Sequence, residues 1–304
     1  MLTAVRRNPS GLAWGLLLVL ALVWGSSFIL IKKGLTAFSP SEVGALRIVA
    51  ASLFLVPIAL PALRKLTRRH LGLLAFIGLV GSLGPAFLFA FAQTKLSSSV
   101  TGILNAVTPL NVLLMGAAFF GRSISRQEIA GLIIGLAGTV VLILAGTHGQ
   151  LNGISYYALL IVAASVCYGF NTNVIKNYLS DLTPVVITSV SLLLAGPLAF
   201  FYLFGLSDFT EKVATGTTGW PLAAIVALGV VGTALALIMF NKLVQLRTAV
   251  FASSVTYLVP MVAIVWGVLD GESLSYQHLL GMVAILGGVY VANRQTKIVS
   301  KTLH

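Results

Sequence analysis

Three polar side chains recur at helical spacing within one long apolar run of the sequence. Thr101, Asn105 and Thr108 are four and then three residues apart, which places them on one face of a helix. Pro109 follows directly, and a proline within a membrane helix frees backbone groups that need a polar environment. The polar face has two interpretations. It forms hydrogen bonds between packed helices, worth about 0.6 kcal/mol each, or it lines a cavity, which the proline slightly favours.

Aromatic and amide side chains occupy comparable depths in other apolar runs. Trp24 and Tyr168 lie about 13 residues into their runs, too deep for the usual aromatic anchors of a membrane interface. Packing is the main alternative to a cavity wall against which a ligand stacks. Asn171 follows Tyr168 by about one helical turn, and Thr256 lies shortly before Pro260. The predicted cavity residues are Trp24, Ser27, Thr101, Asn105, Thr108, Tyr168, Asn171, Thr256 and Tyr257, with helix breaks at Pro85, Pro109 and Pro260.

Arg47 is the one basic residue embedded in an apolar run, and Glu42 precedes it by five residues. A charge inside a membrane is costly and turns inward or finds a partner. A structural arginine, at the interface or paired with Glu42, is the favoured interpretation. The alternative is a guanidinium that binds the carboxylate of a substrate, because the two groups match in geometry. We expect both residues to carry a charge or gating role.

Motifs of soluble enzymes are missing from the sequence. There is no Gly-Lys-Ser/Thr phosphate loop, which excludes an ATP-driven pump within this chain. No apolar run has an Asp, Glu or His at depth that could act as a catalytic acid or base, so we predict no enzyme, no catalytic residues and no cofactor. The histidines do not cluster at metal-ligand spacing, so no metal site is predicted. They are His70, His148, His278 and His304.

The composition identifies the environment that must position these side chains. Of 304 residues, 58% are hydrophobic and only 9% are charged, and the mean hydropathy is +1.02. Soluble domains carry about 25% charged residues, so the chain is predicted to be a polytopic membrane protein. A membrane helix needs about 20 mostly apolar residues, and ten runs qualify, giving an all-α protein with ten transmembrane helices. The runs are about 11–31, 42–61, 71–92, 98–119, 128–146, 154–175, 184–205, 219–240, 249–268 and 275–293.

The distribution of basic residues predicts the orientation in the membrane. With the N-terminus in the cytoplasm and alternating sides, fourteen Lys and Arg residues fall inside and four outside, a strong positive-inside bias. Both termini are then cytoplasmic, in a multi-pass protein of the inner membrane. The net charge of +12 therefore reflects topology and not a nucleic-acid partner. The four outside are Lys32, Lys33, Lys95 and Lys212.

The sequence is internally duplicated. Residues 121–127 (Gly-Arg-Ser-Ile-Ser-Arg-Gln) resemble residues 271–277 (Gly-Glu-Ser-Leu-Ser-Tyr-Gln). Each half, 1–147 and 150–304, then holds five helices, and an odd number makes the second half inverted relative to the first. Inverted repeats are typical of transporters, with the substrate site near the midplane between the halves. One constant offset also aligns Gly25 with Gly169, Lys32 with Lys176 and Pro40 with Pro184.

Several of these segments together resemble a known family. Trp24–Phe28, the pair Ser39-Pro40 leading to Arg47, Leu104–Pro109 and Tyr257–Pro260 are similar to the drug/metabolite transporter superfamily, in its EamA-type branch. The resemblance covers essentially the whole chain. It implies a secondary carrier, often an exporter of amino acids or related metabolites, with a central cavity between two EamA repeats.

Two positions depart from the pattern of that family. The loop before the fifth helix usually has a Glu where this chain has Arg122, and Ser191 stands opposite Arg47 in the second repeat. These departures argue against a strictly symmetric mechanism.

The predicted function is secondary transport of a small organic metabolite by alternating access. An amphipathic amino acid is the favoured substrate because the predicted cavity mixes aromatic, amide and hydroxyl groups, and the family favours export. Alternatives are a sugar, nucleotide-sugar or drug carrier of the same superfamily and, from another class, an intramembrane lipid-modifying enzyme. The expected partners are the substrate and the lipid bilayer. The chain is expected to be a monomer or a homodimer, with close helix contacts at Gly131, Gly135, Gly287 and Gly288.

Overall fold

Helices account for the regular structure of the chain within the ranges that the computed structural model describes, residues 9–145 and 156–293. Helices that follow one another without a loop form longer rods, such as α3, η1 and α4, in which the η1 segment is a π-helix. The elements of the first half are α1 (Pro9–Gly34), α2 (Pro40–Leu63), α3 (Arg68–Gly78), η1 (Leu79–Leu83), α4 (Gly84–Ala92), α5 (Ser98–Asn105), α6 (Thr108–Phe119) and α7 (Arg126–Ala145). Those of the second half are α8 (Tyr156–Tyr178), α9 (Pro184–Gly205), α10 (Phe209–Ala214), α11 (Gly219–Ala227), η3 (Leu228–Leu235), α12 (Ala236–Leu246), α13 (Ala249–Ser253), η4 (Ser254–Tyr257), α14 (Val259–Leu269) and α15 (Tyr276–Asn293).

Eight helical segments in the described ranges are long and apolar enough to cross a membrane. The two other long helices, α7 and α15, have 20 and 18 residues, a length that can also span the hydrocarbon. The prediction of an all-α polytopic protein is confirmed. The predicted count of ten spans fits these eight segments together with α7 and α15.

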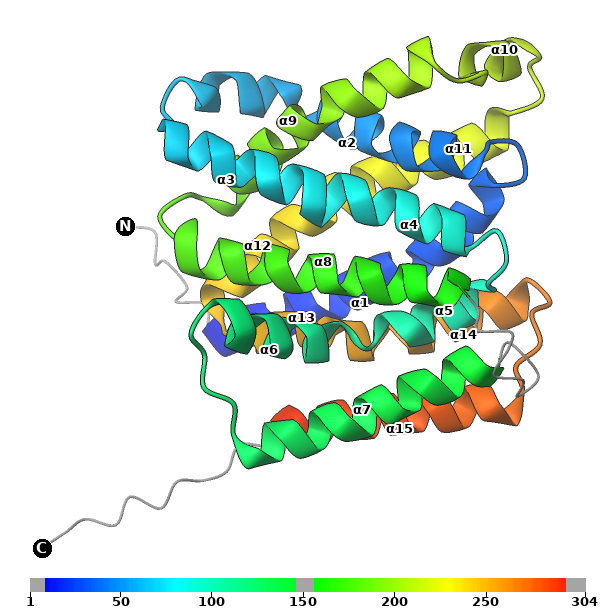
Figure 1. Cartoon of the computed structure of the whole chain (residues 1–304). Coiled ribbons are helices and arrows are strands. Elements are labelled where there is room, and N and C mark those ends of the chain that lie inside the picture. Colours follow the sequence, from blue (N-terminus) through cyan, green and yellow to red (C-terminus); the bar gives the residue numbers. More distant parts are fainter. Residues whose placement is uncertain (1–8, 146–155, 294–304) are drawn as a thin grey trace, which may run out of the picture.

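The helices run side by side along one common direction, and α7 and α15 form a pair at one edge of the bundle (Figure 1). The side chain of Gln127 at the start of α7 donates to the carbonyl of Val291 near the end of α15, over 3.0 Å. The two helices are therefore antiparallel, as expected for corresponding helices of inverted repeats.

Close glycine contacts show the two-repeat arrangement in detail. A Cβ on Gly78 would collide with the carbonyl oxygen of Ser191, and a Cβ on Gly229 would lie 2.7 Å from the carbonyl oxygen of Arg47. These two contacts correspond to each other, because the end of α3 corresponds to the start of η3 and α2 corresponds to α9. The predicted equivalence of Arg47 and Ser191 is thus matched by the packing of their backbones.

Interruptions divide four of the membrane helices near their middle. Helix α5 ends at Asn105 and α6 begins at Thr108, with Pro109 in its first turn. Pro260 stands in the first turn of α14 after the 3-10 segment η4, and Pro85 in the first turn of α4 after η1. A further π-helical segment, η3, has no proline and was not predicted. Such segments often occur at functional sites.

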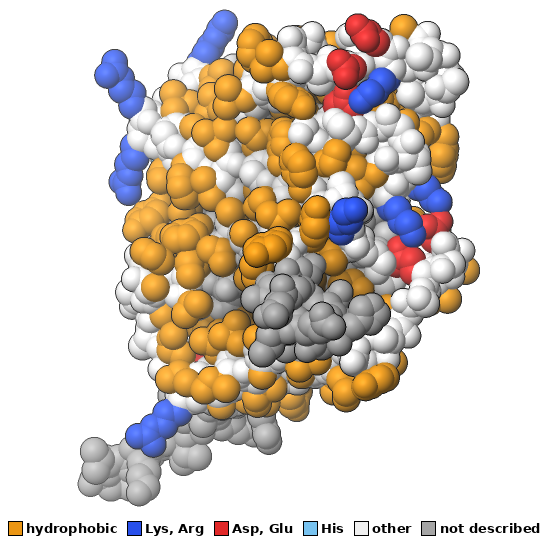
Figure 2. Space-filling view, turned by 45° about the vertical axis from the view of Figure 1, so that its right-hand side comes forward, with side chains coloured by type: hydrophobic (Ala, Val, Ile, Leu, Met, Phe, Trp, Pro, Cys, Tyr) orange, Lys and Arg blue, Asp and Glu red, His pale blue; other side chains and the backbone are white. Residues whose placement is uncertain are grey.

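Charged side chains gather at the two ends of the bundle and leave a hydrophobic surface between them, as Figure 2 shows on one side of the molecule. We call the two ends the basic face and the mixed-charge face. The described Lys and Arg residues of the basic face are Arg64, Lys65, Arg68, Arg69, Arg122, Arg126, Lys176, Lys242 and Arg247. The mixed-charge face comprises Lys32, Lys33, Glu42, Lys95, Asp208, Glu211, Lys212, Asp270 and Glu272.

Candidate functional site

A cavity lies between the two halves at mid-depth of the bundle, where the helices are interrupted. The centres of water molecules have access to about 80 Å³ of it, which is room for several waters. Segments of both repeats form its walls, including α1, α2, η1, α5 and α6 from the first half and α8, η3, α12, α13 and η4 from the second. The residues predicted from the sequence that line it are Trp24, Ser27, Arg47, Asn105, Thr108, Tyr168, Asn171 and Thr256.

Aromatic rings make much of the cavity wall. The indole Nε1 of Trp24 donates to the carbonyl oxygen of Gly232 over 3.0 Å, and its ring lies 5.2 Å from that of Phe240 between centroids. Tyr168 stacks on Phe89 at 6.1 Å between centroids. Because the indole bonds across to the other repeat, Trp24 is held in one orientation at the cavity.

The polar face predicted on α5 and α6 divides at the helix break. Asn105 and Thr108 reach the cavity, and the hydroxyl of Thr108 donates to the backbone carbonyl of Asn105 over 2.7 Å. Thr101 is fully buried, and its hydroxyl donates to the carbonyl of Ser97 within its own helix over 2.8 Å. Tyr257, on η4, packs against the hydrophobic core and is absent from the cavity lining.

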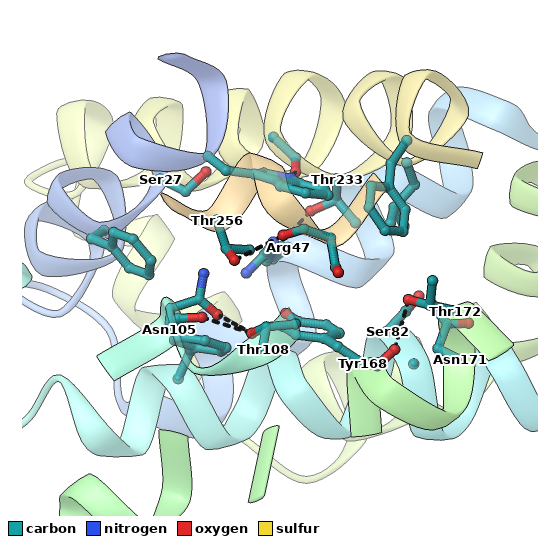
Figure 3. A pocket seen from close by; sticks show the side chains of 18 of the residues that line it. Ser27, Arg47, Ser82, Asn105, Thr108, Tyr168, Asn171, Thr172, Thr233 and Thr256 are labelled. Atoms are coloured by element: carbon teal, nitrogen blue, oxygen red, sulfur yellow. Dashed lines mark hydrogen bonds between the residues drawn. The ribbon is translucent and has the colours of Figure 1, made fainter. Parts of the chain in front are cut away.

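Arg47 enters the cavity from α2. Its Nε donates to the hydroxyl of Thr233 in η3 over 2.6 Å, and that hydroxyl donates in turn to the carbonyl of Leu228 over 3.2 Å. Figure 3 shows the guanidinium in the middle of the site, with Thr233 and Thr256 on one side and Asn105, Thr108 and Tyr168 on the other. The π-helical turn of η3 therefore presents the hydroxyl that orients this arginine.

Glu42 lies on the mixed-charge face and not in the cavity. Its carboxylate accepts from the Nζ of Lys212 over 2.6 Å and from the backbone N–H of Ser39 over 2.7 Å, completing a capping box at the start of α2. The alternative in which Glu42 pairs with Arg47 is therefore wrong. The two side chains leave α2 in different directions, and Glu42 takes its partner from α10.

Several residues of the cavity wall were not predicted from the sequence. Ser82 and Thr233 follow Gly81 and Gly232, and all four line the cavity. Both pairs lie in the π-helical segments η1 and η3, at equivalent positions of the two repeats. A search for small-polar pairs in register between the repeats would have found them. The other missed residues are Phe28, Ile31, Phe89, Thr172, Leu237 and Phe240, and Ser253 on α13 also lines the cavity.

A buried carboxylate joins three segments at the mixed-charge face. Glu272, in the loop between α14 and α15, accepts from the backbone N–H of Ser98 over 2.9 Å and of Ser99 over 3.0 Å, at the start of α5. The hydroxyl of Ser99 and the Nζ of Lys32 also donate to it, over 2.7 and 2.9 Å. Burial alone would raise the pKa of Glu272, but these hydrogen bonds outweigh it and lower the pKa to about 2.

Asp270 extends the same network. Its two carboxylate oxygens lie 2.7 Å from the Nζ of Lys32 and 2.6 Å from the Nζ of Lys33. Hydrogen bonds from these two lysines hold the pKa of Asp270 below its usual value. The end of α1, the start of α5 and the loop after α14 are thus linked at the mixed-charge face; we call these contacts of Glu272 and Asp270 the carboxylate network.

Within the described ranges, no group of three or more His, Cys, Asp or Glu side chains is placed to hold a metal ion. The side chains that line the cavity can form hydrogen bonds, an ion pair and stacking contacts with a small molecule. They offer one cation, hydroxyl and amide groups, and aromatic faces.

Comparisons with known proteins agree with this architecture. The model of the "EamA-like transporter family" matches twice, at residues 11–144 and 155–294. A "Probable terminal-alkyne amino-acid exporter" of Streptantibioticus cattleyicolor is 26% identical, over 93% of each chain. A "Probable amino-acid metabolite efflux pump" of Salmonella typhimurium is 28% identical, over 91% of this chain and 93% of its own.

A solved structure described only as "Crystal structure of protein" supports the fold. It superposes with a TM-score of 0.64 at 19% identity, over 92% of this chain and 96% of its own. The two family matches correspond to the two halves of the bundle, and they confirm the predictions of a transporter, and not an enzyme, from the drug/metabolite transporter superfamily. The chain belongs to the EamA-like transporter family.

Proposed function

We propose that this protein is a secondary transporter that exports amino acids or closely related metabolites across the inner membrane by alternating access. The observation that carries the proposal is the cavity between the two inverted repeats, lined by polar and aromatic side chains at the level of the helix breaks. The names of the relatives support amino acids and export, and an inner membrane transporter of Escherichia coli that is 26% identical supports the location.

Alternating access requires the cavity to open to one side at a time. The interruptions at Pro109 and Pro260 provide points at which half-helices can tilt, because the backbone hydrogen bonds are already broken there. At the mixed-charge face the carboxylate network joins α1 and α5 to the second repeat. Opening toward that face would require these contacts to break.

Removing a cavity wall should impair transport without removing the protein from the membrane. Trp24→Ala eliminates an aromatic face and the hydrogen bond to Gly232. We expect uptake of the transported amino acid into proteoliposomes to fall by about tenfold, equivalent to about 1.4 kcal/mol. Asn105→Ala should also lower uptake. The uptake of both variants is measured with a panel of labelled amino acids.

The control is Ile134→Ala on α7, whose side chain is exposed on the outside of the bundle. It should leave uptake close to that of the wild type. If the cavity variants lower only thermal stability and leave substrate affinity unchanged, Trp24 and Asn105 are packing residues and the proposed site is wrong.

We propose further that the basic face is cytoplasmic, with both termini on that side. The support is the excess of Lys and Arg at that end of the bundle. In a Cys167→Ala background, a cysteine at exposed Thr94 should react with a membrane-impermeant thiol reagent in intact cells. A cysteine at exposed Lys65 should react only after permeabilisation. The reverse pattern would show the opposite orientation.

A further inference from the structure

Arg47 is the one charged side chain among the residues that line the cavity. It lies in the second turn of α2, fixed by the hydrogen bond from its Nε to Thr233. A charge in the membrane interior normally pairs with an opposite charge or lines a functional path. The group that neutralises this guanidinium is therefore expected to take part in the function of the protein.

No Asp or Glu side chain of the protein neutralises Arg47. The sequence has only seven acidic residues, all of them in the described ranges, and none lines the cavity. Five of the seven have basic partners elsewhere, namely Glu42 with Lys212, Glu128 with Arg122, Asp181 with His70, Asp270 with Lys32 and Lys33, and Glu272 with Lys32. The other two, Asp208 and Glu211, are exposed at α10. The cavity therefore has a formal charge of +1.

The guanidinium is also oriented to receive an anion. Its Nε–H is taken by Thr233, and within the described residues no further hydrogen bond of its side chain is found. The two terminal nitrogens remain for a ligand in the cavity (Figure 3). Two parallel N–H donors match the two oxygens of a carboxylate, and such charge-assisted bidentate pairs are among the strong hydrogen bonds of proteins.

The repeat symmetry does not supply a second site of this kind. Ser191 occupies the position equivalent to Arg47, and its hydroxyl donates to the carbonyl of Thr188 in its own helix over 3.1 Å. Ser191 is absent from the cavity lining. The cavity can thus bind one carboxylate by a guanidinium, off the symmetry axis.

We propose that Arg47 binds the carboxylate of the transported substrate and sets a charge limit on it: net-neutral and net-anionic carboxylates are accepted, and net-cationic compounds are rejected. This inference rests on the proposed function, because it places the substrate in the central cavity. A zwitterion brings a carboxylate to Arg47 and its ammonium to neutral groups, the amide of Asn105 and the faces of Trp24 and Tyr168. A second positive charge would find no acid and would be repelled by Arg47.

The test compares probes that differ in charge but share an aromatic ring. They are phenylalanine (net 0), 3-phenylpropionate (net −1) and phenethylamine (net +1). Binding to the full-length protein in detergent is measured as the rise in melting temperature with ligand concentration. We expect phenylalanine and 3-phenylpropionate to bind at least tenfold more tightly than phenethylamine. Equal binding of all three would overturn the proposal.

Arg47→Gln should abolish this preference for carboxylates, and Arg47→Lys should retain part of it because the charge remains. Thr233→Val keeps the charge but removes the acceptor that orients it, and should weaken carboxylate binding less than Arg47→Gln does. Ser191→Ala is the matched control at the equivalent position of the other repeat and should leave the preference unchanged. If Arg47→Gln binds the carboxylate probes in preference to phenethylamine as strongly as the wild type does, the proposal is wrong.

A second comparison, of gluconate with glucose, tests the role of Arg47 separately from the proposed function. Gluconate and glucose differ in the carboxylate but are not amino acids. If gluconate binds more tightly than glucose in an Arg47-dependent way while no amino acid of the panel binds, the amino-acid substrate is wrong and the role of Arg47 stands. If the wild-type protein binds neither 3-phenylpropionate more tightly than phenethylamine nor gluconate more tightly than glucose, the role of Arg47 is wrong whichever compound is transported.

Discussion

Replacing Gly78 with alanine should destabilise the protein strongly, whereas the same change at Gly72, in the same helix, should not. The Cβ at position 78 would collide with the backbone carbonyl of Ser191, and a backbone cannot move aside as a side chain does. At position 72 the added Cβ has no atom within 4 Å apart from its chain neighbours and the nearby backbone of its own helix. Overpacking of this kind typically costs about 1–3 kcal/mol and occasionally more.

The measurement is the midpoint of thermal unfolding of the purified protein in detergent. Gly229→Ala should lower it as Gly78→Ala does, because Gly229 makes the equivalent approach to the carbonyl of Arg47 at 2.7 Å. If Gly78→Ala and Gly72→Ala melt at the same temperature, α3 and α9 do not approach as closely as the structure shows. Gly229→Ala carries a further consequence, since it would displace the turn of α2 that holds Arg47.

The fold was predictable because the apolar runs and the duplicated segments can both be recognised in the sequence. Long apolar runs define the helices, and matched segments such as 121–127 and 271–277 reveal the duplication. Prolines indicated the breaks before α6 and α14. The break at η3 has no such signal, because a π-helical turn leaves the backbone bonded and changes only which carbonyl is used.

The cavity was predictable where a membrane helix has a costly polar side chain, or an aromatic side chain too deep to anchor at the membrane interface. Trp24, Asn105, Tyr168 and Asn171 all line it. The prediction for Thr101 failed because a threonine hydroxyl can bond to a carbonyl of its own helix and then needs no cavity.

The partner of Glu42 could not be predicted from the residues near it in the sequence. Arg47 is five residues away, but five residues turn a helix by about 140° beyond one full turn, so the two side chains point apart. The actual partner, Lys212, is 170 residues distant and reaches Glu42 only through the packing of α10.

Glu272→Gln should loosen the mixed-charge face and destabilise the protein. The carboxylate accepts two backbone N–H groups, one hydroxyl and one ammonium, and an amide cannot replace all four, since one end of it is a donor. Leaving buried donors without an acceptor costs about 1–3 kcal/mol. We expect a lower thermal midpoint, and Glu211→Gln, an exposed acid on the same face, is the control that should not change it.

The same variant should show whether the carboxylate network also closes the cavity. Ile31 lines the cavity directly next to Lys32. In a Cys167→Ala background, a cysteine at Ile31 should react faster with an impermeant thiol reagent when Glu272→Gln is present. On the basic face Arg122 stands at the position equivalent to Glu272 and pairs with Glu128 at 2.6 Å, so among the described residues the second face has no counterpart of the Glu272 contacts. If Glu272→Gln lowers the stability but leaves the labelling of the cysteine at position 31 unchanged, Glu272 only caps α5 and does not close the cavity.

The pH dependence provides an independent check on the charge of Glu272. Its pKa in the folded protein is about 2, below the ordinary value of 4.5, so its ionised form favours the folded state. That stabilisation is fully present above about pH 4.5 and is lost progressively as the pH falls toward 2. The difference in thermal midpoint between the wild type and Glu272→Gln should therefore be constant from pH 7 to pH 5 and should shrink between pH 4.5 and pH 3. A difference that stays constant down to pH 3 would mean that the carboxylate of Glu272 does not hold this face through its charge.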